Sequence, residues 1–320
     1  MLLPKTGSKG LTMSKLQISA SFKSTNSTLI PSATHIINRD LTSAKLLISQ
    51  FVKLSSAADF TPSFSGLSDL SGKGNNKGVV TKIVGLLKAR IAEPWTIDQA
   101  RTSLCGPAVF FYCLAKDCPA LYVKSVIELY MYGETKINDL HIKPSSSCKK
   151  AKLPEEMASI DWITLASLTD SSNSLYNYDS DADQFSGITL PGKLESWFKA
   201  AGYKHVSQHT NLFFDKSVGS LLKAQRAFKA GKNVCLFLSA KSLNVPMTIS
   251  LIPNHWVAMS RSLKVGNPRS TIFSSNADEI KDEKFDLQVF TWGKEAKGMN
   301  PEKLSLHEFS DYYFGYVIAS

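Results

Sequence analysis

The strongest constraint on the fold is a nearly continuous apolar run from Cys105 to Ala115. A helix that is apolar on nearly every side has to be enclosed by other elements, so the run predicts a buried helix of a globular domain. The run is too short to cross a bilayer, which takes about 20 apolar residues, and we expect no transmembrane segment. The N-terminus lacks the apolar core of a cleavable signal peptide.

The composition is that of a globular protein, with 43% hydrophobic and 20% charged residues among 320. It excludes a wholly disordered chain, a coiled coil and a collagen-like repeat. The formal net charge of +10 would suit an anionic partner, but the Lys and Arg residues are spread along the chain and form no nucleic-acid module. We therefore expect a solvated basic surface and no specific nucleic-acid ligand.

Residues 1–78 differ from the rest of the chain because they are rich in Ser and Thr and poor in acidic residues. This composition disfavours a dense core, so we expect a partly disordered N-terminal region with one short amphipathic helix between Leu46 and Leu54. Its last residues, 71–78, are typical of a flexible linker. The predicted folded domain spans 79–320.

Hydrophobic periodicity divides this domain into a helical first part and a strand-rich last part. Helices followed by antiparallel strands indicate an α+β fold. The sequence predicts helices over 79–91, 105–116, 122–132, 191–201 and 218–230, polar loops over 145–152 and 169–186, and strands over 234–238, 247–252, 255–261, 271–274, 285–292 and 312–319.

Cys105 has the sequence context of a nucleophile. It opens the apolar helix in the segment Gln99-Ala-Arg-Thr-Ser-Leu-Cys-Gly-Pro. The free N–H groups and the dipole at a helix N-terminus favour the thiolate over the thiol. Gln99 can direct its amide N–H toward an oxyanion that forms beside Cys105, together with the backbone N–H of Cys105. The alternative is a buried structural thiol, the role that we expect for Cys113, Cys118 and Cys235.

The cysteines and acidic residues predict neither disulfide bonds nor a metal site. The five cysteines lack the paired Cys/His spacing of a zinc site, and the acidic segment 179–183 lacks the spacing of a calcium loop. We expect reduced thiols, no metal and no other cofactor.

The base for this cysteine is expected at His255. The segment from Asn254 to Met259 puts this histidine at the start of an apolar strand, where the backbone is held rigidly and the ring can face a cleft. Residues 289–293 end another strand, and antiparallel pairing brings the end of the second strand beside the start of the first. The alternative is a satisfied histidine at a strand edge. His205 and His209 are expected on the surface.

Together these segments resemble the papain-like cysteine peptidase superfamily. Gln99-x5-Cys105-Gly106 resembles its oxyanion glutamine and nucleophile, Asn254-His-Trp-Val-Ala its histidine strand, and Phe290-Thr-Trp-Gly its Asn-Ser-Trp-Gly segment. Cys-Gly-Pro-Ala with an apolar helix, followed later by His-Trp-Val, is also similar to bacteriocin-processing peptidases and papain-fold bacterial toxins. The resemblance implies a papain-like fold, with the cysteine on an N-terminal helical part and the histidine on a C-terminal antiparallel sheet.

This sequence departs from the family's pattern at the residue that orients the histidine. The family's Asn or Asp falls on Phe290, which cannot accept a hydrogen bond, and an imidazole without an orienting group can adopt the wrong tautomer. By position, Thr291 and Gln288 are the first candidates for this role, and a Cys–His dyad without a third member is the other option. The further candidates are Asp286, Asn276 and Asp278.

The activity that the resemblance implies is that of a cysteine hydrolase, or thiol protease. The Cys105 thiolate attacks an amide carbonyl, Gln99 stabilises the oxyanion, His255 protonates the leaving amine, and water hydrolyses the thioester. The implied substrate is a protein or peptide, including a peptidoglycan peptide. Side-chain deamidation and acyl transfer use the same constellation, whereas a catalytically inactive papain-like binding module and a non-enzymatic basic adaptor are alternatives of other classes.

The loose N-terminal region resembles that of bacterial effectors secreted without a cleavable signal peptide. This likeness implies a virulence toxin or effector that acts in a host or target cell, with a cognate immunity protein or a chaperone as candidate partner. Otherwise we expect a cytoplasmic protein.

Overall fold

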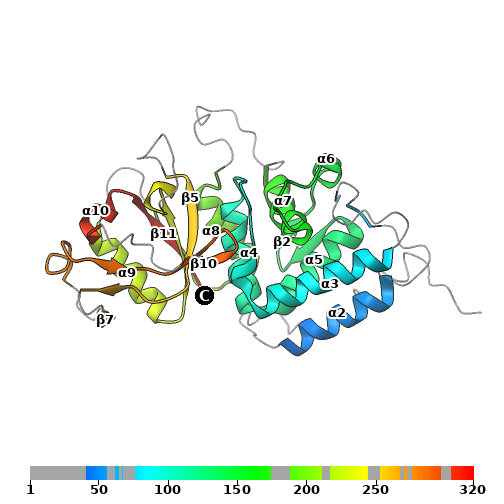
Figure 1. The fold of residues 1–320 in the computed structure, drawn as a ribbon, viewed down its shortest axis with the longest axis horizontal. Coiled ribbons are helices and arrows are strands. Elements are labelled where there is room, and N and C mark those ends of the chain that lie inside the picture. The colour runs from blue at the N-terminus through cyan, green and yellow to red at the C-terminus, as the bar shows by residue number, and fades with distance from the viewer. Residues whose placement is uncertain are drawn as a thin grey trace, which may run out of the picture.

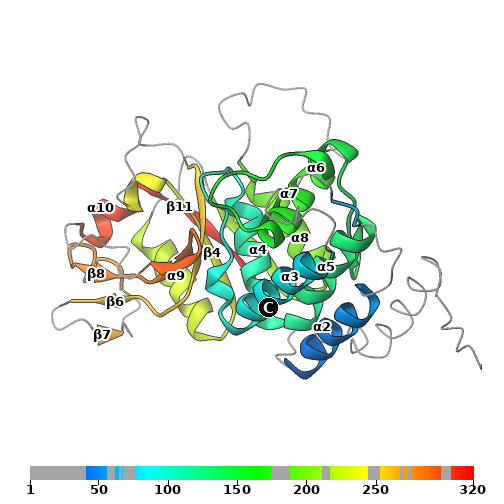
Figure 2. The same cartoon turned by 45° about the vertical axis from the view of Figure 1, so that its right-hand side comes forward.

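The apolar run forms helix α4 (Cys105–Asp117), in which every residue except Lys116 is buried. Helices pack on one side of α4 and an antiparallel sheet packs on the other (Figures 1 and 2). This architecture confirms the predicted α+β class. The structure, a computed structural model, describes residues 41–55, 62–64, 67, 76–173, 188–210, 217–243, 253–266, 270–271, 276–296 and 304–320.

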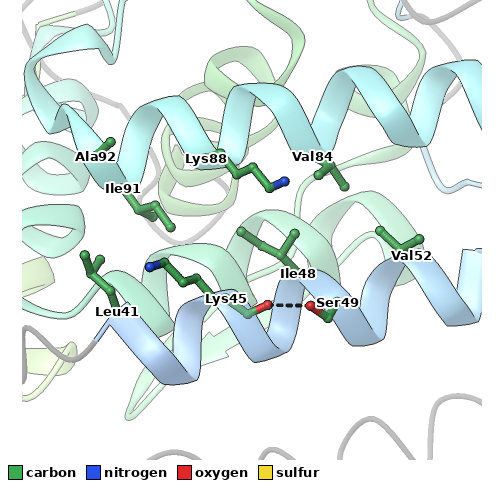
Figure 3. A pocket seen from close by; sticks show the side chains of 9 residues that line it. All are labelled: Leu41, Lys45, Ile48, Ser49, Val52, Val84, Lys88, Ile91 and Ala92. Atoms are coloured by element: carbon green, nitrogen blue, oxygen red, sulfur yellow. Dashed lines mark hydrogen bonds between the residues drawn. The ribbon is translucent and has the colours of Figure 1, made fainter.

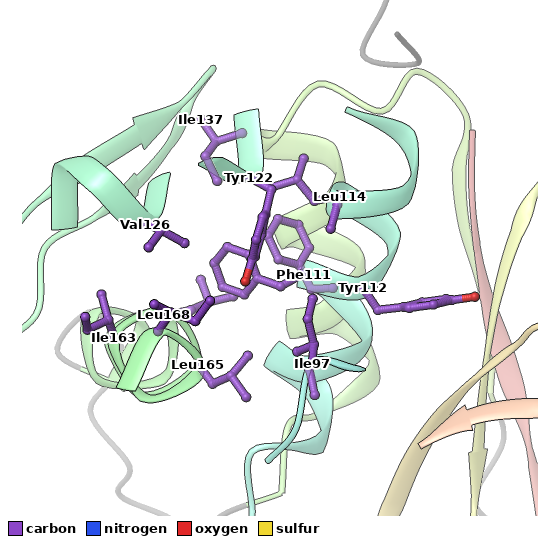
Figure 4. Close-up of a cluster of buried hydrophobic side chains, with 14 of the residues drawn as sticks. Ile97, Phe111, Tyr112, Leu114, Tyr122, Val126, Ile137, Ile163, Leu165 and Leu168 are labelled. Atoms are coloured by element: carbon purple, nitrogen blue, oxygen red, sulfur yellow. The ribbon is translucent and has the colours of Figure 1, made fainter. Parts of the chain in front are cut away.

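The helical part encloses α4 with apolar and aromatic side chains. Phe111 and Leu114 of α4 point toward the neighbouring helices, whereas Tyr112 points toward the sheet (Figure 4). Proline at the first position and Gly133 in the left-handed conformation (φ 74°) set the two ends of α5. The elements of this part are α2 (Leu41–Ser55), α3 (Asn76–Ala92), the 3₁₀ turn η2 (Pro94–Thr96), α5 (Pro119–Tyr132), β1 (Thr135–Ile137), β2 (Leu140–Ile142), α6 (Ser146–Lys150), α7 (Ser159–Asn173) and α8 (Pro191–Ala200).

The main sheet is antiparallel throughout and has the strand order β10-β9-β5-β4-β11-β3. Alternation along β5 puts Trp256 and Ala258 in the core shared with α4, and Val257 and Met259 in a second core against α9. The strands are β3 (Val206–Thr210), β4 (Asn233–Leu238), β5 (His255–Met259), β9 (Val289–Thr291), β10 (Lys294–Ala296) and β11 (Tyr313–Ala319).

Smaller elements complete the far side of the sheet. A short sheet has the order β7-β6-β8, and α9 carries an N-cap in which the Ser217 hydroxyl accepts the N–H of Ser220. These elements are α9 (Val218–Lys229), the 3₁₀ turn η4 (Ala240–Leu243), β6 (Lys264–Val265), β7 (Ser270–Thr271), β8 (Phe285–Asp286) and α10 (Leu306–Ser310).

The structure differs from the sequence expectation in several elements. The predicted strand over 285–292 is two strands, β8 and β9, that belong to different sheets. The predicted loop over 145–152 contains α6, because the Ser145 hydroxyl accepts the N–H of Cys148 and caps a short helix. The sequence predicts neither helix α7, whose end occupies the first residues of the predicted loop over 169–186, nor the short strands β1, β2, β3, β6 and β10. The predicted strand over 247–252 lies outside the described residues, as do the residues before Leu41.

The buried core includes residues on both sides of the predicted domain boundary at residue 78. Helix α2 precedes the boundary and packs against α3 and α5. Ala44, Leu47 and Phe51 of α2 are fully buried in the same core as α4. The amphipathic stretch is therefore a helix of the folded part. No helix among the described residues has the length and apolar character needed to span a membrane.

Candidate active site

Cys105 is the first residue of α4 and its side chain is buried, with 3% exposure. Burial raises the pKa of the Cys105 thiol to about 11, and the backbone N–H groups of Trp256, Gly106 and Cys105 hydrogen-bond the sulfur and limit that rise. Because Trp256 directly follows His255, the helix N-terminus meets β5 at the predicted histidine. The burial, however, leaves the thiol uncharged at neutral pH.

Gly106 allows α4 to approach the chain at Thr189. A Cβ atom on Gly106 would lie 2.2 Å from Thr189 Oγ1 and 2.3 Å from Thr189 Cβ, distances that packed atoms do not reach. The carbonyl oxygen of Thr189 in turn accepts a hydrogen bond of 2.7 Å from Trp256 Nε1. Thr189 therefore ties the first turn of α4 to the start of β5.

His255 is also buried, with 4% exposure. Its Nε2 lies 2.7 Å from Thr291 Oγ1, and its ring stacks on Trp292 with centroids 4.3 Å apart and planes 15° apart. Burial lowers the pKa of His255 to about 3, because the charged ring would lose its hydration. The ring is neutral at pH 7. In the tautomer whose Nε2–H donates to Thr291 Oγ1, Nδ1 has the lone pair that can accept a proton from a nucleophile.

The register of β5 and β9 explains why Thr291 bonds the histidine. Ala258 pairs with Phe290, so Thr291 comes opposite Val257 and shares the sheet face of His255. Phe290 points to the other face, where it stacks on Tyr112 of α4 with centroids 4.2 Å apart. The residue at the family's Asn position is thus part of the core. The predicted antiparallel pairing of the two strands is confirmed.

Gln288 does not reach the histidine. Its carbonyl oxygen accepts the N–H of Ser260, which follows the last residue of β5, so Gln288 lies at the opposite end of the strand from His255. A side chain at this register position also belongs to the face of Phe290 rather than that of Thr291. The prediction that Gln288 orients His255 is therefore wrong, because Gln288 lies at the far end of β5.

A tight turn holds the indole of Trp292 over the histidine. Trp292 (φ 45°) and Gly293 (φ 68°) are the two central residues between paired Thr291 and Lys294, and two positive φ values define a type I′ hairpin turn. A Cβ atom on Gly293 would lie 2.8 Å from Asp98 Cβ. The turn therefore packs directly on the loop that carries the predicted oxyanion residue.

That loop is anchored by a buried ion pair. Asp161 of α7 accepts Arg90 of α3 through two hydrogen bonds, of 3.1 and 2.6 Å, and its Oδ2 also accepts the backbone N–H of Asp98 at 3.1 Å. Burial alone would lower the pKa of Arg90, but the hydrogen bond and charge of Asp161 outweigh it and raise this pKa. Burial also raises the pKa of the Asp161 carboxyl, against the lowering effect of Arg90 and of the Asp98 N–H. The hydrogen bonds of this pair fix the position of the loop at Asp98.

Gln99 lies in this anchored loop and is 5% exposed. Its Nε2 donates to the Thr102 carbonyl oxygen at 3.1 Å, while the Thr102 hydroxyl and N–H both donate to the Gln99 carbonyl oxygen. One amide N–H is thus engaged, and the other remains for an external acceptor. Ala100, in the left-handed conformation (φ 50°), is held by a hydrogen bond to Asp98 Oδ1.

The fold therefore brings the segments that carry the predicted residues to the start of β5, but of their side chains only those of His255 and Thr291 are joined by a hydrogen bond among the described residues. Around the start of β5, the fold brings together the segments that carry Gln99, Cys105, His255 and Thr291. No hydrogen bond among the described residues joins the Cys105 sulfur to the His255 ring: the sulfur meets β5 from the α4 side, and the ring turns to Thr291. Thiol and imidazole are both neutral in this arrangement.

Sequence reasoning missed the residues that support the site, namely Thr189, Asp161 and Asp98. Each acts on a residue that is distant in sequence or through its backbone, so no local pattern marks it. Within the described part of the chain, no group of three or more His, Cys, Asp or Glu residues could hold a metal ion. No protein-family model, curated protein or solved structure matches this chain.

Proposed function

We propose that the chain is a papain-like cysteine hydrolase that cleaves an amide bond through a thioester on Cys105. The observation that carries the proposal is the packing of the first turn of α4 against the start of β5, where Thr189 contacts Gly106 and accepts a hydrogen bond from Trp256, the residue after His255. The bond from His255 to Thr291 and the stacked indole of Trp292 supply the orienting group and the cover that such a histidine needs.

The neutral resting pair indicates general-base activation rather than a preformed ion pair. Because His255 shares the sheet face of Thr291 while α4 packs on the other face, substrate binding has to turn the ring from Thr291 toward the sulfur at the start of β5. Catalytic hydrogen bonds often form only in the complex. His255 Nδ1 then takes the thiol proton as sulfur bonds to the carbonyl carbon, and Thr291 holds Nε2. The free N–H of Gln99 and the backbone N–H of Cys105 receive the oxyanion.

The second half of the reaction returns the enzyme to its starting state. The imidazolium gives its proton to the leaving amine, the C–N bond breaks, and a thioester remains on Cys105. Water attacks this thioester while His255 again accepts a proton, which it passes to the departing sulfur. A peptide bond, a side-chain amide or a peptidoglycan amide all fit this balance, and an amine in place of water gives acyl transfer.

The proposal further assigns the protein to secreted bacterial effectors or toxins that act on a host or competitor cell. The support for it is the acid-poor, Ser/Thr-rich composition of the N-terminal residues together with the papain-like motifs. A cognate immunity protein or a chaperone is the partner that this role would require.

The test measures where oxygen from isotopically labelled water is incorporated into the products. Wild type, Cys105→Ala and Thr291→Val are incubated with a peptide mixture in H₂¹⁸O, and the products are read by mass spectrometry. Label at new C-termini indicates cleavage, label in side-chain carboxyls indicates deamidation, and unlabelled amide adducts indicate transfer. We expect product from wild type, none from Cys105→Ala, and about 10- to 100-fold less from Thr291→Val, because the neutral ring loses one buried hydrogen bond.

Cys148→Ala is the matched control, since Cys148 is another buried thiol, on α6, away from the site. It should keep wild-type activity. Equal product from wild type and Cys105→Ala would overturn the proposal. A second candidate is a catalytically inactive papain-like binding module, which the burial of Cys105 and His255 and the phenylalanine at position 290 favour. That candidate predicts no label in any product.

A further inference from the structure

A groove of about 600 Å³ runs between α2 and α3 and includes no residue of the candidate active site. Figure 3 shows the two helices side by side, with the lining side chains directed into the space between them. Ile48 and Ile91 form a buried apolar floor, whereas Leu41 and Val52 on its edge are 38% and 43% exposed. The groove is therefore an apolar surface that is only partly covered by its own helices.

Two lysines from opposite helices stand within this apolar groove. Lys45 projects from α2 and Lys88 from α3, between the apolar side chains of the two helices (Figure 3). Among the described residues, neither ammonium group has a salt bridge. The sequences of α2 and α3 contain no Asp or Glu, and Lys53 and Lys82 add to their positive charge. The groove thus combines apolar contact with positive charge that lacks a counter-charge on its own helices.

An acidic amphipathic helix matches both properties. Its apolar stripe would cover the floor and the exposed edge, while carboxylates beside the stripe would pair with Lys45 and Lys88. With about 1.5 Å per residue, α2 offers a groove wall of roughly 20 Å, the length of a helix of about four turns. The space between two helices favours a convex partner such as a third helix over a flat bilayer surface.

We propose that the groove between α2 and α3 is a docking site for an acidic amphipathic helix of a partner protein. The bound helix would add a third helix to the α2–α3 pair and bury its apolar edge. This proposal does not depend on catalysis, because none of the groove residues belongs to the site around Cys105 and His255.

The test uses the full chain and a fluorescent synthetic helix with leucines on one face and glutamates on both sides of that face. We expect this acidic peptide to bind in a fluorescence anisotropy titration, and a peptide with lysines in place of the glutamates not to bind. Replacing both Lys45 and Lys88 by Glu should weaken acidic-peptide binding by at least 10-fold and allow the lysine peptide to bind. Replacing the half-exposed Val52 by Gln should also weaken binding.

The matched control carries the same charge change elsewhere, at the exposed Lys150 and Lys152, and should bind the acidic peptide as wild type does. Circular dichroism confirms that each variant is folded. Equal loss of binding in both double variants would overturn the proposal, since it would indicate attraction by net charge alone. Absence of acidic-peptide binding to wild type would also overturn it. Binding of phosphatidylglycerol vesicles that is stronger than peptide binding and lost with Lys45→Glu and Lys88→Glu would assign the groove to a membrane instead.

Discussion

The buried neutral imidazole of His255 predicts a specific loss of stability in acid. Its pKa falls from 6.5 to about 3 on folding, because burial removes the hydration of the charged ring. The unfolded chain therefore binds a proton at a higher pH than the folded chain does. Above pH 6.5 the ring is neutral in both states and has no effect on stability through its protonation. As the pH falls from 6.5 toward 3, only the unfolded chain gains the proton, so the free energy of unfolding decreases.

The size of the effect follows from the shift. Each pH unit inside this window costs about 1.4 kcal/mol, so the free energy of unfolding should fall by about 2 kcal/mol between pH 7 and pH 5 through His255 alone. The assay is urea denaturation followed by tryptophan fluorescence at both values. In His255→Gln this contribution disappears, so the difference between wild type and the variant should shrink by about 2 kcal/mol on acidification.

Other groups also titrate between these two pH values, so a control is needed. His205 is exposed, and His205→Gln should lose as much free energy on acidification as wild type does. If His255→Gln and wild type lost the same free energy from pH 7 to pH 5, the ring would not be buried and neutral as the structure has it. The inference of general-base activation would then fail as well.

Three further predictions concern the surroundings of the site. Burial raises the pKa of Cys105 to about 11. Iodoacetamide should therefore alkylate Cys105 at pH 8 about 100-fold more slowly than an exposed thiol, as measured by peptide mass spectrometry. Equal rates for the two thiols would contradict this prediction. Gly106→Ala should lower the free energy of unfolding by about 1–3 kcal/mol, because the added methyl group overpacks the contact with Thr189. Gly85→Ala is the control: it lies in open space within α3 and should raise the free energy of unfolding by about 0.5–1 kcal/mol. Equal effects of the two substitutions in urea denaturation would refute the close contact at Gly106. Asp161→Asn should lower the free energy of unfolding by about 3–5 kcal/mol in the same assay, because it leaves the buried Arg90 without its counter-ion. A decrease below about 1 kcal/mol would show that water solvates the pair.

The sequence was most informative where a pattern is local. The nearly continuous apolar run predicts α4, the spacing of apolar residues over 122–132 predicts α5, and proline or glycine at the helix ends helps to predict α8 and α9. Helix α7 was missed because it carries many hydroxyl side chains, and those of Thr164, Ser171 and Ser172 donate to the carbonyl oxygen four residues before them. A segment rich in Ser and Thr is typical of a loop when only the sequence is considered, because the sequence does not show that the hydroxyl groups bond to the helix backbone.

For the candidate site, too, the sequence was informative about local features and uninformative about long-range ones. Position along the chain was enough to name Cys105, His255 and Thr291, since each stands at an element end. The break between Asp286 and Val289 has no glycine or proline, so the sequence could not show that Gln288 leaves the site. The side-chain register that decides such a question depends on which strands pair, and this is a long-range property of the fold.

Because α4 is enclosed by the helices on one side and by the sheet on the other, the two parts share the core around this helix. The two should therefore unfold in one cooperative transition. Amide hydrogens near Phe110 and Phe111, which are fully buried, should exchange with solvent only when both parts unfold. Those at the exposed start of α2, near Leu41, should exchange through local fraying. Hydrogen exchange would then reveal α4 as the last element to lose protection.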